Sequence, residues 1–262
     1  MRQPKPTNSS EWLVRLLKLV YRPLVRRAAG QALRGRWLDE QRPNLGRWLT
    51  SDVDAFVKST WRRVDELLPR ARLGELPTQG NRHNVFLAVV TTAAYQTLLE
   101  RGVSRRYAST LVGDVGWKLY AWMLNVAALP ARITTRDPYK RVERTLQALL
   151  LFPFSAPGAP GYEVEAWSEG DRFLTHWTHC PPHVFVRDLV KNQGDHGELD
   201  AFYHSWCLYD WPAADLLAGD GERGHYTRPH TMSRGDPVCD MCWLGRAPKA
   251  QQNEPGELDA DS

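Results

Sequence analysis

The sequence lacks any long apolar segment free of charged residues and proline, so no stretch is suited to cross a bilayer. It has only four cysteines in 262 residues, too few for a disulfide framework in a chain of this length. Residues 1–5 do not open a secretory signal, because neither a long apolar core nor a small-residue cleavage site follows them. We therefore expect a cytoplasmic protein with reduced thiols.

Charge of one sign is not in large excess either. Lys and Arg total 34 and Asp and Glu total 30, a net charge of +4, so no nucleic-acid partner is expected. The sequence also has no glycine-rich phosphate loop, Gly-x-Ser-x-Gly elbow, His-Glu-x-x-His motif or dinucleotide-binding fingerprint. These absences argue against an NTPase, a serine esterase, a zincin metalloprotease and a Rossmann dehydrogenase. The sequence requires no cofactor.

Helical periodicity dominates residues 1–150. Apolar and amphipathic segments predict helices over 51–68, 84–99, 105–129 and 137–151. A further helix near the N-terminus combines apolar residues with Arg15, Lys18 and Arg22. Its basic face fits a helix docked on the core with solvated arginines, and it leaves open a surface association with a membrane or another anionic partner.

The second half of the chain has a different character. Residues 152–161 contain three prolines and two glycines and predict a loop. Period-two alternation predicts hairpins over 162–178 and 225–244, with helices at 184–191 and 199–209 between them. We expect an α+β fold, in which a mostly helical N-terminal region (1–150) packs with a small antiparallel sheet of two hairpins in an α+β region at 160–245. Residues 246–262 are expected to form a disordered tail.

Cysteine and histidine gather in the same region, with all four cysteines and seven of the eight histidines between residues 176 and 242. Three pairs share a two-residue spacing that lets both side chains bind one metal: Cys180 with His183, His204 with Cys207, and Cys239 with Cys242. On a strand the last pair would point to opposite faces, which argues against a shared metal. One interpretation is a divalent metal such as zinc bound by Cys180, His183, His204 and Cys207. The other is that buried thiols act as small apolar groups.

The same residues also fit acid–base or nucleophilic chemistry. Cys207 and Asp210 lie three residues apart on a predicted helix and share a face, while Cys239 and Asp240 are adjacent in the second hairpin. A thiolate is a strong nucleophile when its pKa is lowered, and a nearby carboxyl group can transfer protons. The cluster favours an enzyme.

Short motifs follow one another in a fixed order between residues 160 and 245: Cys180-Pro181, Gly197-Glu198-Leu199, Cys207-x-x-Asp210 and Arg228-x-x-Thr231-x-x-x-Gly235-Asp236-x-x-Cys239-Asp240. This series resembles the L-2-amino-thiazoline-4-carboxylic acid hydrolase family. The resemblance implies an α+β fold that encloses a ligand pocket and a hydrolase that opens a thiazoline or a related C–N/C–S heterocycle. In that reaction water adds to the C=N carbon and the C–S bond breaks, which leaves an N-carbamoyl cysteine.

Carried onto this chain, the resemblance implies catalytic positions at Cys180, Cys207, Asp210, Cys239 and Asp240. It makes Asp210 the candidate general acid and base, and Cys207 or Cys239 the candidate nucleophile. The implied substrate-binding residues are Arg228, Thr231 and Arg234, with either arginine pairing with a substrate carboxylate.

The motif series also departs from the family. Met241 and Cys242 stand where members usually have an aromatic and a basic residue, so a different substrate is expected. The Gly235-Asp236-x-x-Cys239 element is in addition similar to the ending of vinyl-reductase-type small-molecule-binding domains. That similarity implies the alternative function, a non-catalytic sensor that binds a small molecule or a metal.

Overall fold

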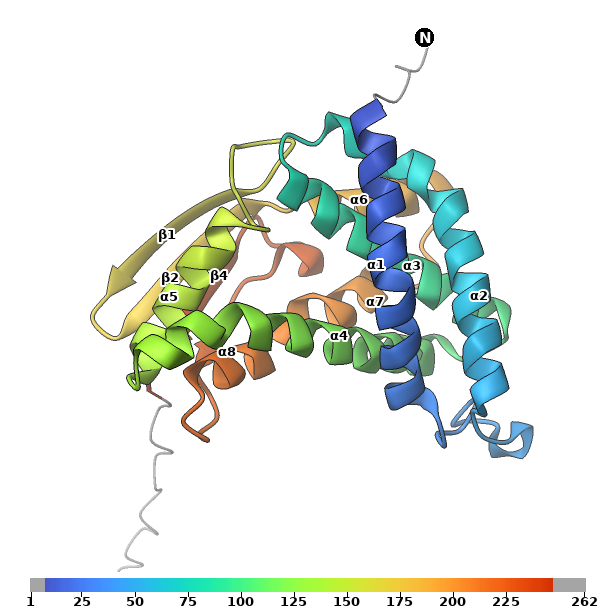
Figure 1. Cartoon of the computed structure of the whole chain (residues 1–262). Helices are drawn as coiled ribbons and strands as arrows, with labels where there is room; N and C mark the ends of the chain where they lie inside the picture. Colours follow the sequence, from blue (N-terminus) through green and yellow to red (C-terminus); the bar gives the residue numbers. More distant parts are fainter. Residues whose placement is uncertain (1–7, 247–262) are drawn as a thin grey trace, which may run out of the picture.

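The computed structural model describes residues 8–246, and the tail predicted beyond Arg246 lies outside the described residues. The N-terminal part is built from long helices, which are α1 (Asn8–Leu33), α2 (Thr50–Leu67), α3 (Gln79–Glu100), α4 (Arg105–Thr134) and α5 (Pro138–Leu151). Short 3-10 turns connect some of them, namely η1 (Pro43–Leu45), η2 (Leu68–Ala71) and η3 (Leu73–Glu75). This helical part occupies most of the view in Figure 1.

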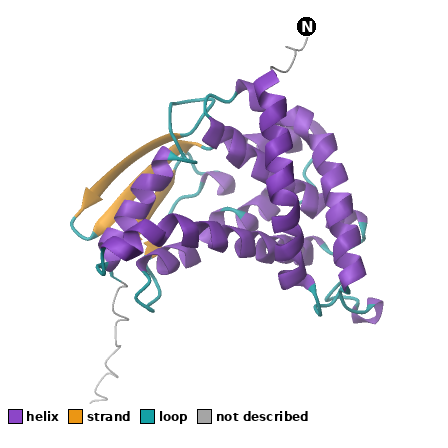
Figure 2. Ribbon diagram, in the orientation of Figure 1, coloured by secondary structure: helices purple, strands orange, loops and turns teal. Residues whose placement is uncertain are grey.

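The second half contains the strands and shorter helices: β1 (Glu163–Glu169), β2 (Arg172–His179), α6 (Pro181–Gln193), α7 (Glu198–Ser205), η4 (Cys207–Tyr209), α8 (Asp210–Ala218), β3 (Tyr226–Thr227), η5 (Met232–Arg234) and β4 (Cys239–Leu244). The strands form one antiparallel sheet in the order β1-β2-β4-β3. Figure 2 shows the sheet at one side of the helices. The fold is therefore α+β, with the helical part first and a small antiparallel sheet in the C-terminal half.

Local sequence signals explain several element boundaries. The Asp137 side chain caps α5, because its Oδ1 accepts the backbone N–H groups of Tyr139 and Lys140. Pro138 occupies the first turn, where a missing N–H costs nothing. Between β1 and β2 the turn is only two residues long, and Gly170 supplies its left-handed conformation (φ 61°).

Two elements differ from the sequence predictions. The helix predicted to run to Tyr209 ends at Ser205, where the backbone of Trp206 leaves helical geometry and its indole N–H donates to Thr91 Oγ1 at 3.0 Å. Helix α8, which then begins at Asp210, was not predicted. The first strand of the second hairpin is only two residues long, because the chain leaves the sheet at Arg228, whose side chain turns into the protein.

The buried side chains form two hydrophobic cores. The first is built by α1, α2, α3, the N-terminal part of α4, α6 and α7, and its largest fully buried members include Phe56 and Phe86. The second lies between the C-terminal part of α4, α5, α8 and the inner face of the sheet, and it includes Leu124, Leu217 and Trp243. Helices α6 and α7 return to the first core although they follow the proline-rich loop, so the two cores do not coincide with regions 1–150 and 160–245. Within residues 8–246, no helix is both long and apolar enough to cross a membrane.

Candidate functional site

A buried ion pair lies at the centre of the candidate site. Asp210 is the first residue of α8, and Arg228 directly follows β3. Arg228 Nη1 donates to Asp210 Oδ2 at 2.7 Å, and the arginine side chain is only 1% exposed. Its Nη2 donates to the carbonyl oxygen of Cys207 at 2.9 Å, and the guanidinium lies 4.7 Å from the centre of the Trp211 ring. The geometry therefore makes Arg228 a positioning residue for Asp210.

The two carboxylate oxygens of Asp210 have different surroundings. Oδ2 accepts from Arg228 and from the Tyr226 hydroxyl, which lies 3.3 Å away. No hydrogen bond from the described residues reaches Oδ1, and the side chain keeps 17% of its surface exposed. Burial raises the pKa of Asp210 to about 6, against the opposing effect of the Arg228 charge and of both hydrogen bonds. A carboxyl group with a pKa near neutrality and one oxygen without a protein partner can both accept and donate a proton.

Three thiols lie near this carboxyl group. Cys180 precedes α6, Cys207 begins η4 and Cys239 begins β4. The Cys207 Sγ atom lies 3.2 Å from the hydroxyl oxygen of Ser233, and Cys239 Sγ accepts the backbone N–H of Met232 at 3.2 Å. The 3-10 turn η5 thus holds two of the three cysteines in place. We call Cys180, Cys207, Asp210, Arg228 and Cys239 the Asp210 cluster.

The thiols of the Asp210 cluster are poor candidates for thiolates. Burial raises the pKa of all three, that of Cys207 to about 12. The negative charges that Cys207, Cys239 and Asp210 can carry raise the pKa of Cys180 further, which places these groups near one another. Because a neutral thiol is a weak nucleophile, this arrangement favours proton transfer at Asp210 over attack by Cys207 or Cys239.

Aromatic side chains that the sequence did not assign to the site pack beside it. Tyr120 of α4 stacks on Tyr209 with ring centres 5.5 Å apart. Burial and then the charge of Asp210 raise the pKa of the Tyr120 hydroxyl, so this phenol stays protonated. The spacing of Trp117 and Tyr120 on one helix face was visible in the sequence, but such spacing is equally typical of core packing.

Two buried donors at the site have no hydrogen-bond acceptor among residues 8–246. They are the indole Nε1 of Trp177 and the Nε of Arg228. Trp177 lies opposite Cys239 in the pairing of β2 with β4, so its side chain belongs to the same face of the sheet. Buried donors without a partner are costly, and an oxygen atom of a bound ligand would satisfy them.

Asp240 is one predicted catalytic residue that the structure places elsewhere. It follows Cys239 on β4, so its side chain points to the opposite face of the sheet. There its carboxylate accepts the backbone N–H of His230 at 2.7 Å, and its second oxygen lies 2.7 Å from His230 Nδ1. Asp240 therefore fixes the connection between β3 and β4 from outside the Asp210 cluster.

The other two predicted substrate-binding residues are also engaged with the protein. Thr231 is buried, and its backbone N–H donates to Asp236 Oδ2 at 2.7 Å. Arg234 is exposed, donates to Asp200 Oδ1 at 3.2 Å and lies 3.7 Å from the centre of the Tyr203 ring. Of the three predicted residues, only Arg228 therefore belongs to the Asp210 cluster.

The two histidines among the predicted zinc ligands contact other parts of the protein. His204 Nδ1 is 2.9 Å from the carbonyl oxygen of Asp200, and the His183 ring packs 5.8 Å from that of Phe202. In the described part of the chain, no three His, Cys, Asp or Glu side chains are placed to hold a metal ion. Zinc binding by Cys180, His183, His204 and Cys207 stays a prediction, which elemental analysis of the purified protein tests.

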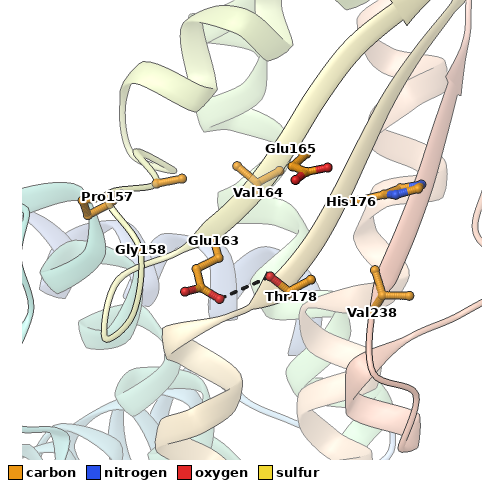
Figure 3. A pocket seen from close by; sticks show the side chains of 9 residues that line it. Pro157, Gly158, Glu163, Val164, Glu165, His176, Thr178 and Val238 are labelled. Atoms are coloured by element: carbon orange, nitrogen blue, oxygen red, sulfur yellow. Dashed lines mark hydrogen bonds between the residues drawn. The ribbon is translucent and has the colours of Figure 1, made fainter.

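A surface pocket of about 500 Å³ lies between the loop at 156–158 and strands β1 and β2. Figure 3 shows Glu163, Glu165 and His176 around it, with Glu163 Oε2 accepting the hydroxyl of Thr178 at 3.2 Å. No member of the Asp210 cluster lines this pocket, so it is a separate feature of the surface.

No protein-family model matches the chain, and neither a curated protein nor a solved structure matches it. The chemistry of the site is therefore what bears on the function.

Proposed function

We propose that the chain is a hydrolase that opens a thiazoline or a related C–N/C–S heterocycle, with Asp210 as the group that transfers protons. The observation that carries the proposal is the state of this carboxyl group. Its side chain is only 17% exposed, its pKa is raised to about 6, and its Oδ1 has no hydrogen-bond partner among residues 8–246. Such a group is matched to proton transfer near neutral pH.

In the proposed reaction this oxygen accepts a proton twice and gives it up twice. As the water oxygen bonds to the ring carbon of the C=N bond, Asp210 Oδ1 takes a proton from the water and passes it to the ring nitrogen. The new hydroxyl group then forms a carbonyl while the C–S bond breaks. Asp210 takes the hydroxyl proton and delivers it to the leaving sulfur, so one water is consumed and one thiol is released.

Other members of the site position these groups. Arg228 and Tyr226 bond to Oδ2 and thereby turn Oδ1 toward the substrate. Trp177 Nε1 and Arg228 Nε are buried donors without an acceptor among residues 8–246, and a polar substrate atom that reached them would satisfy them. In this mechanism the neutral thiols lie beside Asp210 as small, weakly polar groups.

The test is release of a thiol from L-2-amino-thiazoline-4-carboxylate, followed with Ellman's reagent at catalytic protein concentration. Asp210→Asn keeps the shape of the side chain but cannot accept the proton, so turnover falls by about 10²–10⁴-fold. Asp188→Asn, an exposed position on α6, is the matched control and keeps full activity. Circular dichroism confirms that both variants fold. An Asp210→Asn protein as active as the wild type contradicts the assignment.

A second candidate function is the small-molecule sensor of the vinyl-reductase type. The raised pKa values of the three thiols favour it, because protonated thiols and aromatic rings can line a pocket without reacting. Calorimetry with the same thiazoline separates the two functions. Binding without thiol release, unaffected by Asp210→Asn, supports the sensor and excludes hydrolysis of that compound.

A further inference from the structure

Helix α1 has two apolar faces where one is expected. Its inner face carries Leu13, Leu17, Tyr21 and Val25 into the first core. On the opposite face, large apolar side chains of the N-terminal half are exposed to solvent: Trp12 (63%), Leu16 (39%), Leu19 (73%) and Val20 (45%). Trp12, Leu16 and Leu19 follow one another at spacings of four and three residues and form one stripe, which Val20 widens. The inner face already anchors α1, so this outer stripe is left without a partner in the described chain.

The outer face of α1 changes character in its C-terminal half. Here Arg26, Arg27 and Arg34 line a groove of about 460 Å³ between α1 and the first turns of α2. Pro23 belongs to the groove and lies at helical spacing from Leu16 and Leu19, so the groove continues the apolar stripe.

The groove keeps a positive charge. Among the described residues, Asp54 is the only acidic one that lines it, and Arg26 donates to its carboxylate at 2.7 and 3.0 Å. Arg34 donates its Nε to the carbonyl oxygen of Gly30 at 2.9 Å and not to Asp54. Three arginines and one aspartate therefore leave two positive charges.

We propose that the outer face of α1 binds the surface of an anionic phospholipid bilayer, with the helix lying in the plane of the membrane. The apolar stripe enters the boundary between headgroups and acyl chains, and the arginine groove receives lipid phosphate groups. From Trp12 to Pro23 the stripe is about 17 Å long, at 1.5 Å per residue. An apolar stripe continuous with a cationic groove fits a lipid surface better than a nucleic acid, which offers the stripe no apolar partner. Figure 1 shows α1 on the outside of the helical part, where a flat surface can reach it.

The test is sedimentation of the full chain with vesicles of phosphatidylcholine alone and of phosphatidylcholine mixed with phosphatidylglycerol. The wild type binds the mixed vesicles, and binding falls as the salt concentration rises. Leu19→Asp in the stripe and Arg27→Glu in the groove each lower the partition coefficient about tenfold or more. Leu151→Asp, at a residue 80% exposed on α5, and Arg187→Glu, on α6, are the matched controls and bind like the wild type.

Several outcomes overturn the proposal. Absence of binding to mixed vesicles, or equal loss in the control variants, removes α1 as a lipid-binding face. If inorganic phosphate displaces the protein from vesicles more than chloride does at equal ionic strength, the groove is a site for soluble phosphate. If the protein without vesicles sediments as a dimer and Leu19→Asp makes it a monomer, a second copy covers the stripe.

Discussion

The buried carboxyl group of Asp210 makes the stability of the protein depend on pH in a direction opposite to that of most aspartates. Its pKa rises from 3.8 to about 6 on folding. At about 1.36 kcal/mol per pKa unit, this shift corresponds to about 3 kcal/mol. Between these two pKa values the folded protein holds more protons at this group than the unfolded chain. The free energy of unfolding therefore falls as the pH rises through this window.

Asp210→Asn removes this dependence, because asparagine keeps an acceptor for Arg228 but does not titrate. We expect the difference in unfolding free energy between the wild type and the variant to change by about 2–3 kcal/mol from about pH 4 to about pH 7.5. As the pH rises, the wild type becomes less stable relative to the variant. Urea denaturation at a series of pH values measures this difference, and groups that titrate in both proteins cancel.

Asp188→Asn, exposed on α6, is the control for the loss of one carboxylate elsewhere on the protein. If the Asp210→Asn difference stays constant with pH, the carboxyl group does not have a raised pKa. That result would refute both the buried charge and the use of Asp210 as an acid and base near neutrality.

Two further predictions concern other parts of the structure. With Ellman's reagent under native conditions, we expect Cys242 on the outer face of the sheet to react first. Cys207 reacts slowly, because burial raises its pKa to about 12. Cys242→Ser removes the fast phase of the reaction, and a fast phase that persists in this variant would contradict the prediction. His225 is fully buried, with Nδ1 3.0 Å from Asp215 Oδ1 and Nε2 3.2 Å from Asp220 Oδ2. His225→Ala therefore lowers the free energy of unfolding, measured by urea denaturation, by about 2–4 kcal/mol. A loss below about 1 kcal/mol would show that these contacts contribute little to stability.

Much of the fold could be predicted because its signals are local. The cap at Asp137, the apolar periodicity of α2 and the alternation in β1 and β2 depend on neighbouring residues only. The helix break at Trp206 could not be predicted in this way, because it depends on a hydrogen bond to Thr91, more than a hundred residues earlier. The short length of β3 likewise depends on the hydrogen bond between Arg228 and Asp210 and not on a turn signal in the sequence.

The same distinction between local and distant signals applies to the residues of the site. Cys207 and Asp210 are close in sequence, but the helix expected to carry both on one face ends at Ser205, so Cys207 begins η4 and Asp210 begins α8. Strand alternation in the hairpin predicted over 225–244 already implied that Asp240 points away from Cys239, whereas the contact of Asp240 with His230 depends on the fold. Trp177 gave no sequence signal, since a tryptophan on a strand is typical of core packing and its unpartnered N–H is a property of the fold.

Helix α4 belongs to both hydrophobic cores, with Leu111 in the first and Leu124 and Ala128 in the second. Tyr120 lies between these positions, beside the Asp210 cluster. One continuous helix thus crosses the junction of the cores, and the cores cannot swing apart about a hinge while it stays intact. A rearrangement around Asp210 therefore involves side chains and connecting loops and not the closure of two domains.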